Sequence, residues 1–151
     1  MDTLLAIQTR RSVRKYTDQS IDEERLDAIL RAGMASPTAG NSQSWRFVVV
    51  DDKKLLALIA SLSPYTAMAA AAPMAVLLCA DLEAEKYPGF WVQDCAAAMQ
   101  NMLLAAHAQG LGAVWCGIHP DAEREKAFAE AFNLPPHFSA FGLMVLGHPA
   151  D

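Results

Sequence analysis

A long apolar stretch in the second half of the chain, residues 90 to 109, limits the folds that this sequence can adopt. Its apolar side chains are spread around the helical circumference instead of along one face: Phe90, Trp91, Val92, Cys95, Met99, Met102, Leu103 and Leu104. A helix that is apolar nearly all round must be enclosed by other parts of a structure. In a chain of 151 residues, we expect one side of this helix to face the chain's own sheet and the other side to face a second subunit.

Periodic apolar residues and turn-forming residues divide the rest of the chain into short helices and strands. Ser20 and Glu23 have the spacing of a capping box, which predicts the start of a helix. Asp51 or Asp52, and Asp121, predict the starts of two more helices. The predicted helices are 2–9, 20–34, 53–62, 90–109 and 121–132, and the predicted strands are 45–50, 73–80, 112–117 and 138–147. Four strands with helices before, between and after them indicate a layered α+β or α/β domain.

Composition narrows the class of protein and its location. A chain of 151 residues fits a single domain, 1–151, and its 53% share of apolar residues predicts some surface that needs a partner. A formal net charge of -5 argues against binding to nucleic acid or to an anionic membrane. The longest apolar run, 67–80, is too short to cross a bilayer. Cys79, Cys95 and Cys116 have neither zinc-ligand spacing nor an even number, which predicts a reducing, cytoplasmic location.

Several common catalytic motifs are absent from the sequence. Gly110 and Gly112 lie after a predicted helix and before a strand, the reverse of the order in a dinucleotide-binding fingerprint. The four histidines are scattered, so we predict no metal site. The cysteines fall in predicted buried elements without a neighbouring cation, which predicts unreactive thiols. The charged run 121–126 is typical of a solvated helix face.

The segment RRSVRKY, residues 10–16, concentrates positive charge in an acidic chain. A basic turn of this kind can simply be solvated. In an extended backbone, however, Arg10, Ser12 and Arg14 point to the same side. Two guanidinium groups and a hydroxyl on one side can bind a phosphate, and three charge-assisted hydrogen bonds of about 1.5 to 3 kcal/mol each would nearly suffice for micromolar binding. The segment therefore predicts a phosphate site, with a solvated turn as the alternative.

Four motifs in order along the chain carry a resemblance to a known family. They are RRSVRKY, SPTAGNSQSWRFVVV, QDCAAAMQNMLLAAHAQGLGAVWCGIHP and FGLMVLGHP. Together they resemble the nitroreductase family of FMN-dependent enzymes over Leu4 to Pro149. The resemblance implies a three-layer α+β fold, with a mixed or antiparallel sheet flanked by helices. It also implies a homodimer that holds two FMN molecules at its interface, with the long central helix buried there.

The resemblance also implies which residues contact the flavin. Arg10, Arg11 and Ser12 would bind the phosphate and ribityl chain, and Arg14 would lie at the pyrimidine edge of the ring, where it stabilises negative charge on the reduced flavin. The loop from 37 to 41 would come from the other subunit. The segment 114–118 would present backbone groups to flavin N5 and O4, and Gly117 would leave room over the ring. The implied cofactor-binding residues are Arg10, Arg11, Ser12, Arg14, Pro37, Thr38, Ala39, Asn41, Val114, Trp115, Cys116, Gly117 and Ile118.

The activity that the resemblance implies needs no catalytic side chain, because the cofactor carries the chemistry. Hydride would pass from NADH or NADPH to flavin N5 and then to a nitroaromatic, a quinone or a similar small acceptor in a ping-pong cycle. Tyr65, Phe90 or Trp91 would line the pocket. Two alternatives stay open: a flavin-binding sensor or storage protein with little turnover, and a binder of phosphorylated metabolites that takes no flavin. An ordinary helix-to-strand turn is the alternative for the 37–41 loop, and a core position is the alternative for Trp115.

Overall fold

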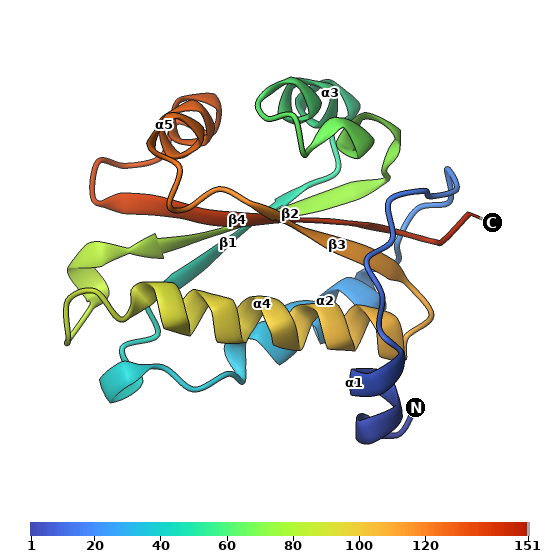
Figure 1. Ribbon diagram of the computed structural model, residues 1–151, viewed down its shortest axis with the longest axis horizontal. Helices are drawn as coiled ribbons and strands as arrows, with labels where there is room; N and C mark the ends of the chain where they lie inside the picture. The colour runs from blue at the N-terminus through green and yellow to red at the C-terminus, as the bar shows by residue number, and fades with distance from the viewer. Residues whose placement is uncertain (151) are drawn as a thin grey trace.

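The computed structural model describes residues 1–150 and has three layers, with a sheet between two layers of helices (Figure 1). The helices are α1 (Thr3–Thr9), α2 (Glu23–Met34), α3 (Lys53–Ser61), α4 (Trp91–Ala108) and α5 (Ala122–Ala131), and the strands are β1 (Trp45–Val50), β2 (Met74–Asp81), β3 (Gly112–Gly117) and β4 (Phe138–Gly147). Three short 3-10 helices, η1 (Ala39–Asn41), η2 (Ala67–Ala71) and η3 (Leu82–Ala84), lie in the connections. The α+β class expected from the sequence is confirmed.

The sheet has the strand order β1-β2-β4-β3, and all three strand pairs are antiparallel. Of the two sheet types expected, the antiparallel one therefore forms among these four strands. One parallel bridge is added at the edge, where Ser12 of the basic segment pairs with Ala113 of β3. This bridge brings the N-terminal segment to the edge of the sheet at which the functional site is built.

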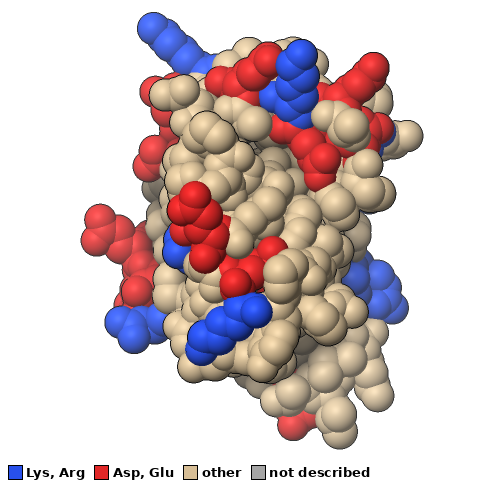
Figure 2. Space-filling view, turned by 90° about the vertical axis from the view of Figure 1, so that its left-hand side faces the viewer, with Lys and Arg blue, Asp and Glu red and all other residues tan. Residues whose placement is uncertain are grey.

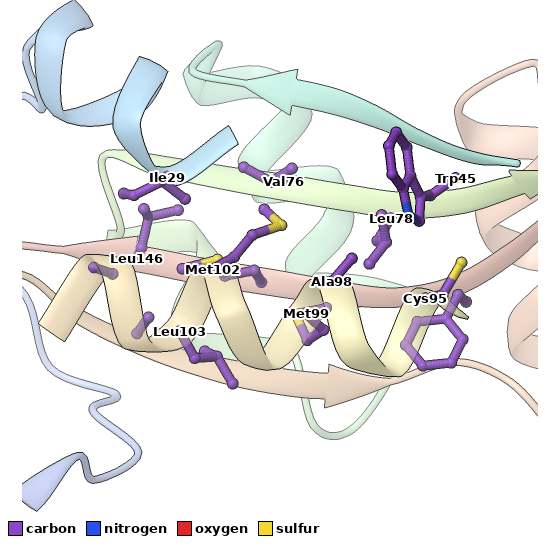
Figure 3. Packing of buried hydrophobic residues seen from close by; sticks show 14 of the residues in the cluster. Ile29, Trp45, Val76, Leu78, Cys95, Ala98, Met99, Met102, Leu103 and Leu146 are labelled. Atoms are coloured by element: carbon purple, nitrogen blue, oxygen red, sulfur yellow. The ribbon is translucent and has the colours of Figure 1, made fainter. Parts of the chain in front are cut away.

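Each face of the sheet has its own hydrophobic core because β2 and β4 are buried along both faces. One core lies between the sheet and the layer of α2 and α4. Figure 3 shows this core, in which Ile29 from α2 and Met102 from α4 meet Val76 of β2. The second core lies under α3 and α5 and contains Ile59 and Phe128. Helices on both faces make the sheet the middle layer.

The long apolar helix α4 is enclosed more fully by its own chain than the sequence indicates. Its buried face packs on the sheet, and α2 covers a second side, where Asn101 Nδ2 donates to Ala32 O at 3.0 Å. Gln93 and Gln100 remain exposed, so one side of α4 has no cover from this chain. Phe90 precedes the helix and is half exposed. None of the helices in residues 1–150 is both long and apolar enough to cross a membrane.

Aspartates begin four of the helices, and one predicted cap is wrong. Asp52 and Asp121 accept from Leu55 N and Arg124 N, as expected from the sequence. The predicted capping box at Ser20 does not form, because α2 begins at Glu23 and its cap is Asp22, which accepts from Arg25 N at 2.9 Å. Ser20 instead lies in the extended segment before the helix.

Candidate functional site

The basic segment is held against the sheet on two sides. Val13 N donates to Ala113 O of β3 at 3.0 Å. Beyond it, Thr17 N donates to His148 O at 2.9 Å, which joins the segment to the residues that follow β4. Tyr16 is half buried, and its hydroxyl donates to Val13 O and to Val145 O. Burial raises the pKa of Tyr16, so its hydroxyl stays a neutral donor. The segment is therefore fixed in an extended form along the edge of β3.

Two adjoining hollows open between this segment, β3 and the neighbouring elements, and each has a volume typical of a small-molecule site. The first, about 490 Å³, is called the strip groove, and its lining residues are Arg10, Ser12, Gln100, Leu103, Trp115, Gly117 and His119. The second, about 470 Å³, is called the tyrosine pocket, and its lining residues are Arg14, Pro64, Tyr65, Ala67, Met68, Val114, Trp115, Cys116 and Gly117. Trp115 and Gly117 belong to both, so the two hollows meet over the end of β3.

Seven of the expected cofactor residues lie together in these hollows. Arg10 and Ser12 line the strip groove, and Arg14 lines the tyrosine pocket beside Val114 and Cys116. Trp115 and Gly117 complete the set in both hollows. Arg10, Ser12 and Arg14 thus line two adjoining hollows that share Trp115 and Gly117.

The end of β3 offers a flat apolar wall beside open space. The Trp115 indole lies against Gly142 of β4, where an added Cβ would come within 2.9 Å of Trp115 Nε1, and it contacts the ring of Phe141. The Trp115 side chain is 38% exposed. At Gly117 an added Cβ would meet nothing within 4 Å. A planar ligand therefore has both an aromatic surface and free space at this point.

Two of the expected residues, Arg11 and Ile118, adjoin residues that line the hollows but do not line them themselves. Arg11 Nη1 donates to Gln8 O and Arg10 O, so its guanidinium closes the C-terminus of α1. Ile118 is buried in the core under α3 and α5. Arg10 and Arg11 differ in this way because neighbouring side chains of an extended backbone point to opposite sides.

The loop with Pro37, Thr38, Ala39 and Asn41 lies at the opposite end of the molecule from the basic segment (Figure 1). It is anchored to the start of α4, because Ala39 N donates to Asp94 Oδ1 at 3.0 Å. Asp94 is a buried carboxylate on the apolar helix, and the sequence pattern gave it no role. Within one chain, the loop and the two hollows are not brought together.

The cysteine beside the tyrosine pocket is an unreactive thiol. Burial raises the pKa of Cys116 to about 11, although Arg14 acts in the opposite direction. Its Sγ contacts Tyr65 O at 3.4 Å. Burial also raises the pKa of Cys79 to about 11 and raises that of Cys95. All three cysteines are free thiols with little thiolate at neutral pH.

Sequence reasoning missed three residues that line the strip groove: Gln100, Leu103 and His119. His119 Nδ1 lies 2.5 Å from Glu125 Oε1, which connects β3 to the helix α5. Glu125 is therefore not part of a simple solvated face, as the charged run 121–126 had indicated. Tyr65, one of three aromatic residues proposed for the pocket, does line it, and Arg124 Cζ lies 4.8 Å from its ring centre.

One group of possible metal ligands occurs among the described residues, and none of its members lines either hollow. Asp81, Glu83 and His137 have ligand atoms within 4.8 Å of one another. Asp81 is already paired with Arg46 at 3.3 Å and accepts from Glu83 N. These interactions account for the Asp81 carboxylate without an ion, so we assign the group no metal role.

Comparison with known proteins places this architecture in a family. The sequence profile described as "Nitroreductase family" matches residues 7–72 and 63–148. A protein of Methanothermobacter thermautotrophicus, provisionally named NADH dehydrogenase/NAD(P)H nitroreductase, is 48% identical over 151 residues, which is 100% of this chain and 79% of the relative. The fold and the sequence agree, and the chain belongs to the nitroreductase family.

Two solved structures extend the comparison. The crystal structure of a provisionally named NADH oxidase from Clostridium acetobutylicum has a TM-score of 0.94 at 38% identity and covers 99% of this chain and 89% of that one. The crystal structure of a provisionally named nitroreductase from Desulfovibrio desulfuricans in complex with FMN has a TM-score of 0.89 at 36% identity, covering 100% of this chain and 88% of that one. The three-layer nitroreductase fold expected from the sequence is confirmed.

Proposed function

We propose that this protein is an FMN-dependent oxidoreductase that takes hydride from NADH or NADPH and passes it to a small acceptor such as a quinone or a nitroaromatic in a ping-pong cycle. Membership of the nitroreductase family supports the enzyme class. Relatives named for FMN reductase and NAD(P)H nitroreductase activity, and a structural neighbour in complex with FMN, support the cofactor and co-substrate. When bound, FMN supplies the two-electron chemistry that no side chain provides.

The residues of the two hollows fit FMN. A phosphate monoester needs cations and hydrogen-bond donors, and the strip groove offers the Arg10 guanidinium and the Ser12 hydroxyl. A flavin ring needs a flat apolar surface and free space, and these occur at Trp115 and above Gly117. Arg14 in the tyrosine pocket would stabilise the negative charge that the reduced ring carries. The single observation that carries the proposal is that Arg10, Ser12 and Arg14 line two adjoining hollows that share Trp115 and Gly117.

A homodimer is part of the proposal. None of the residues of the 37–41 loop lines a hollow of its own chain, and in this proposal the loop reaches the flavin of a partner subunit. Figure 2 faces the end that carries this loop and shows a broad uncharged area between scattered acidic and basic side chains. Tyr87 and Phe90 are exposed there, and Leu4 and Ile7 are exposed on α1. Apolar exposure at both ends is typical of surfaces that an obligate dimer buries.

The remaining expectations complete the proposal. The whole chain, 1–151, would form one FMN-binding domain. A cytoplasmic location suits the three free thiols, since secreted proteins usually pair their cysteines.

The proposal is tested by an anaerobic absorption spectrum of the protein reconstituted with FMN. We expect bound FMN to give a yellow protein that NADH or NADPH bleaches, and a quinone to restore the colour. The double variant Arg10→Ala/Arg14→Ala loses two charged contacts, which predicts FMN affinity weaker by about two to four orders of magnitude. Arg31→Ala is the matched control, because Arg31 pairs with Asp27 on the exposed side of α2.

The outcomes separate the function classes. A yellow protein that NADH and NADPH do not bleach would indicate the sensor or storage alternative. A protein that is colourless after unbound FMN has been removed would contradict flavin binding. Full FMN affinity in Arg10→Ala/Arg14→Ala would contradict the assignment of the site while leaving the enzyme class intact.

A further inference from the structure

A histidine paired with a carboxylate lies in the strip groove, and the proposed function does not use it. His119 Nδ1 is 2.5 Å from Glu125 Oε1, and the two side chains are 27% and 30% exposed. An ionised carboxylate only accepts hydrogen bonds, so Nδ1 carries a proton and donates it to Glu125. The second ring nitrogen, Nε2, takes no part in this pair.

The ring of His119 is fixed in place by its surroundings. The edge of Trp91 meets it, with the ring centres 4.7 Å apart and an interplanar angle of 66°. The backbone N of His119 donates to Phe141 O at 3.0 Å. Among residues 1–150, no hydrogen bond is made by Nε2, although His119 lines the groove. An oriented imidazole with one free nitrogen at a ligand groove is the arrangement that a proton donor needs.

The charged groups around His119 come from three elements. Glu125 of α5 contacts the ring directly. Arg10 lines the same groove, and Arg124 of α5 lies nearby, with Nη1 3.5 Å from Gly117 O. On the side of α4, Glu85 accepts from Trp91 N at 3.0 Å. Of these charged groups, Glu125 is the one that contacts the imidazole directly.

We propose that His119, oriented by Glu125, donates a proton to the electron acceptor during its reduction. The inference rests on the proposed function, because it needs a hydride source at the end of β3. His119 follows Gly117 closely in the chain and lines the same groove, and Gly117 belongs to the segment proposed to face the reactive edge of the flavin.

The proton balance of the reaction requires such a donor. Reduction of a quinone to its hydroquinone adds one hydride, which brings two electrons and one proton, and one further proton. The hydride comes from NAD(P)H by way of FMN, and His119 Nε2 gives the further proton to a quinone oxygen. The neutral imidazole then takes a proton back from water. His119 is the catalytic residue in this step, and Glu125 is a positioning residue.

The test compares two acceptors that differ in their need for a proton. A benzoquinone takes up protons when it is reduced, whereas ferricyanide takes up electrons alone. In His119→Gln we expect reoxidation of the reduced protein by the quinone to slow by about 10²- to 10⁴-fold, the usual contribution of a general acid. Reoxidation by ferricyanide and reduction by NADH should keep their wild-type rates. Glu125→Gln should slow the quinone step by a smaller factor.

A second readout does not depend on turnover. Nitrogen NMR of the FMN-free protein should show His119 with a proton on Nδ1, the nitrogen that faces Glu125. Glu125→Ala, which removes the acceptor oxygen, should change this pattern. The matched control is His137→Gln, since His137 also lies near a carboxylate, Asp81 at 3.8 Å, but lines neither hollow. It should leave the rates with both acceptors unchanged.

The inference and the proposed function fail in different ways. If wild-type protein does not bind FMN or is not reduced by NADH or NADPH, the proposed function is wrong. If those steps occur and His119→Gln reacts with the quinone at the wild-type rate, or loses the same factor with ferricyanide, His119 is not the proton donor. Protonation of Nδ1 that is unchanged in Glu125→Ala would contradict the positioning role of Glu125.

Discussion

Gly112 and Gly117 stand at the two ends of β3 and have opposite surroundings. A Cβ on Gly112 would lie 2.6 Å from Val13 Cγ1, so Gly112 allows the basic segment to pack on the strand. A Cβ on Gly117 would enter open space. One glycine is therefore needed for the structure around the site, while the other keeps the site itself empty.

Substitution of these glycines should separate stability from binding. Gly112→Ala is expected to lower the free energy of unfolding by about 1 to 3 kcal/mol, because it forces Val13 away from β3. Gly117→Ala should leave the free energy of unfolding unchanged or raise it by up to about 1 kcal/mol. It should nevertheless weaken FMN binding by roughly tenfold or more, since the methyl group fills space for the ring. Denaturant unfolding and FMN titration measure the two effects, and wild-type FMN affinity in Gly117→Ala would show that the ring does not lie over this residue.

At the scale of secondary structure, Asp22 and Ser20 can be compared as candidates for the N-terminal cap of α2. Asp22 accepts from Arg25 N, and this hydrogen bond is the main cause that holds its pKa below the ordinary value. Asp22→Ala should therefore lower the midpoint of thermal unfolding at pH 7, whereas Ser20→Ala should leave it nearly unchanged. A depressed pKa stabilises the fold above the unfolded-state pKa of about 4, so the difference between Asp22→Ala and wild type should shrink as the pH falls below that value and through the lower pKa of the folded state. Equal midpoints for the two variants at pH 7 would contradict the assignment of the cap.

Most elements could be predicted because their signals are local. Strands β1, β3 and β4 have the predicted bounds, since apolar runs between turn-forming residues fix them. The cap of α2 was missed because Ser20 and Asp22 both precede a helical pattern, and only the backbone shows which one reaches an amide.

The site was only partly predictable, because some of its contacts join residues that are far apart in the sequence. Arg10, Ser12 and Arg14 lie in one short segment, so their alternation was visible in the sequence. The contacts of Asp94 with Ala39 and of His119 with Glu125 depend on how helices pack against the rest of the chain. A polar residue on an apolar helix, such as Asp94, is a signal that could have been used, because buried carboxylates need a partner.

At the scale of the whole molecule, the hollows and the 37–41 loop are separate parts of one proposed site. The basic segment and β3 line the two hollows, whereas the loop held by Asp94 lines neither of them. A symmetric dimer can bring the loop of one chain to the hollows of the other, twice over. FMN binding should then depend on residues of both chains.

Complementation between two variants that each bind FMN weakly tests this arrangement. Arg10→Ala/Arg14→Ala removes the cations of the hollows, and Asp94→Ala releases the loop by leaving Ala39 N without its acceptor, at a cost of about 1 to 3 kcal/mol. Each variant alone should bind FMN weakly, while Asp94→Asn, which keeps an acceptor oxygen, should bind it nearly as well as wild type. In a mixed dimer, one site combines the intact hollows of one chain with the intact loop of the other. Coexpression of the two variants with different affinity tags should therefore yield heterodimers with one bound FMN each. Heterodimers that hold none would mean that the loop serves the flavin of its own chain, and wild-type FMN affinity in Asp94→Ala alone would mean that the loop contacts no flavin.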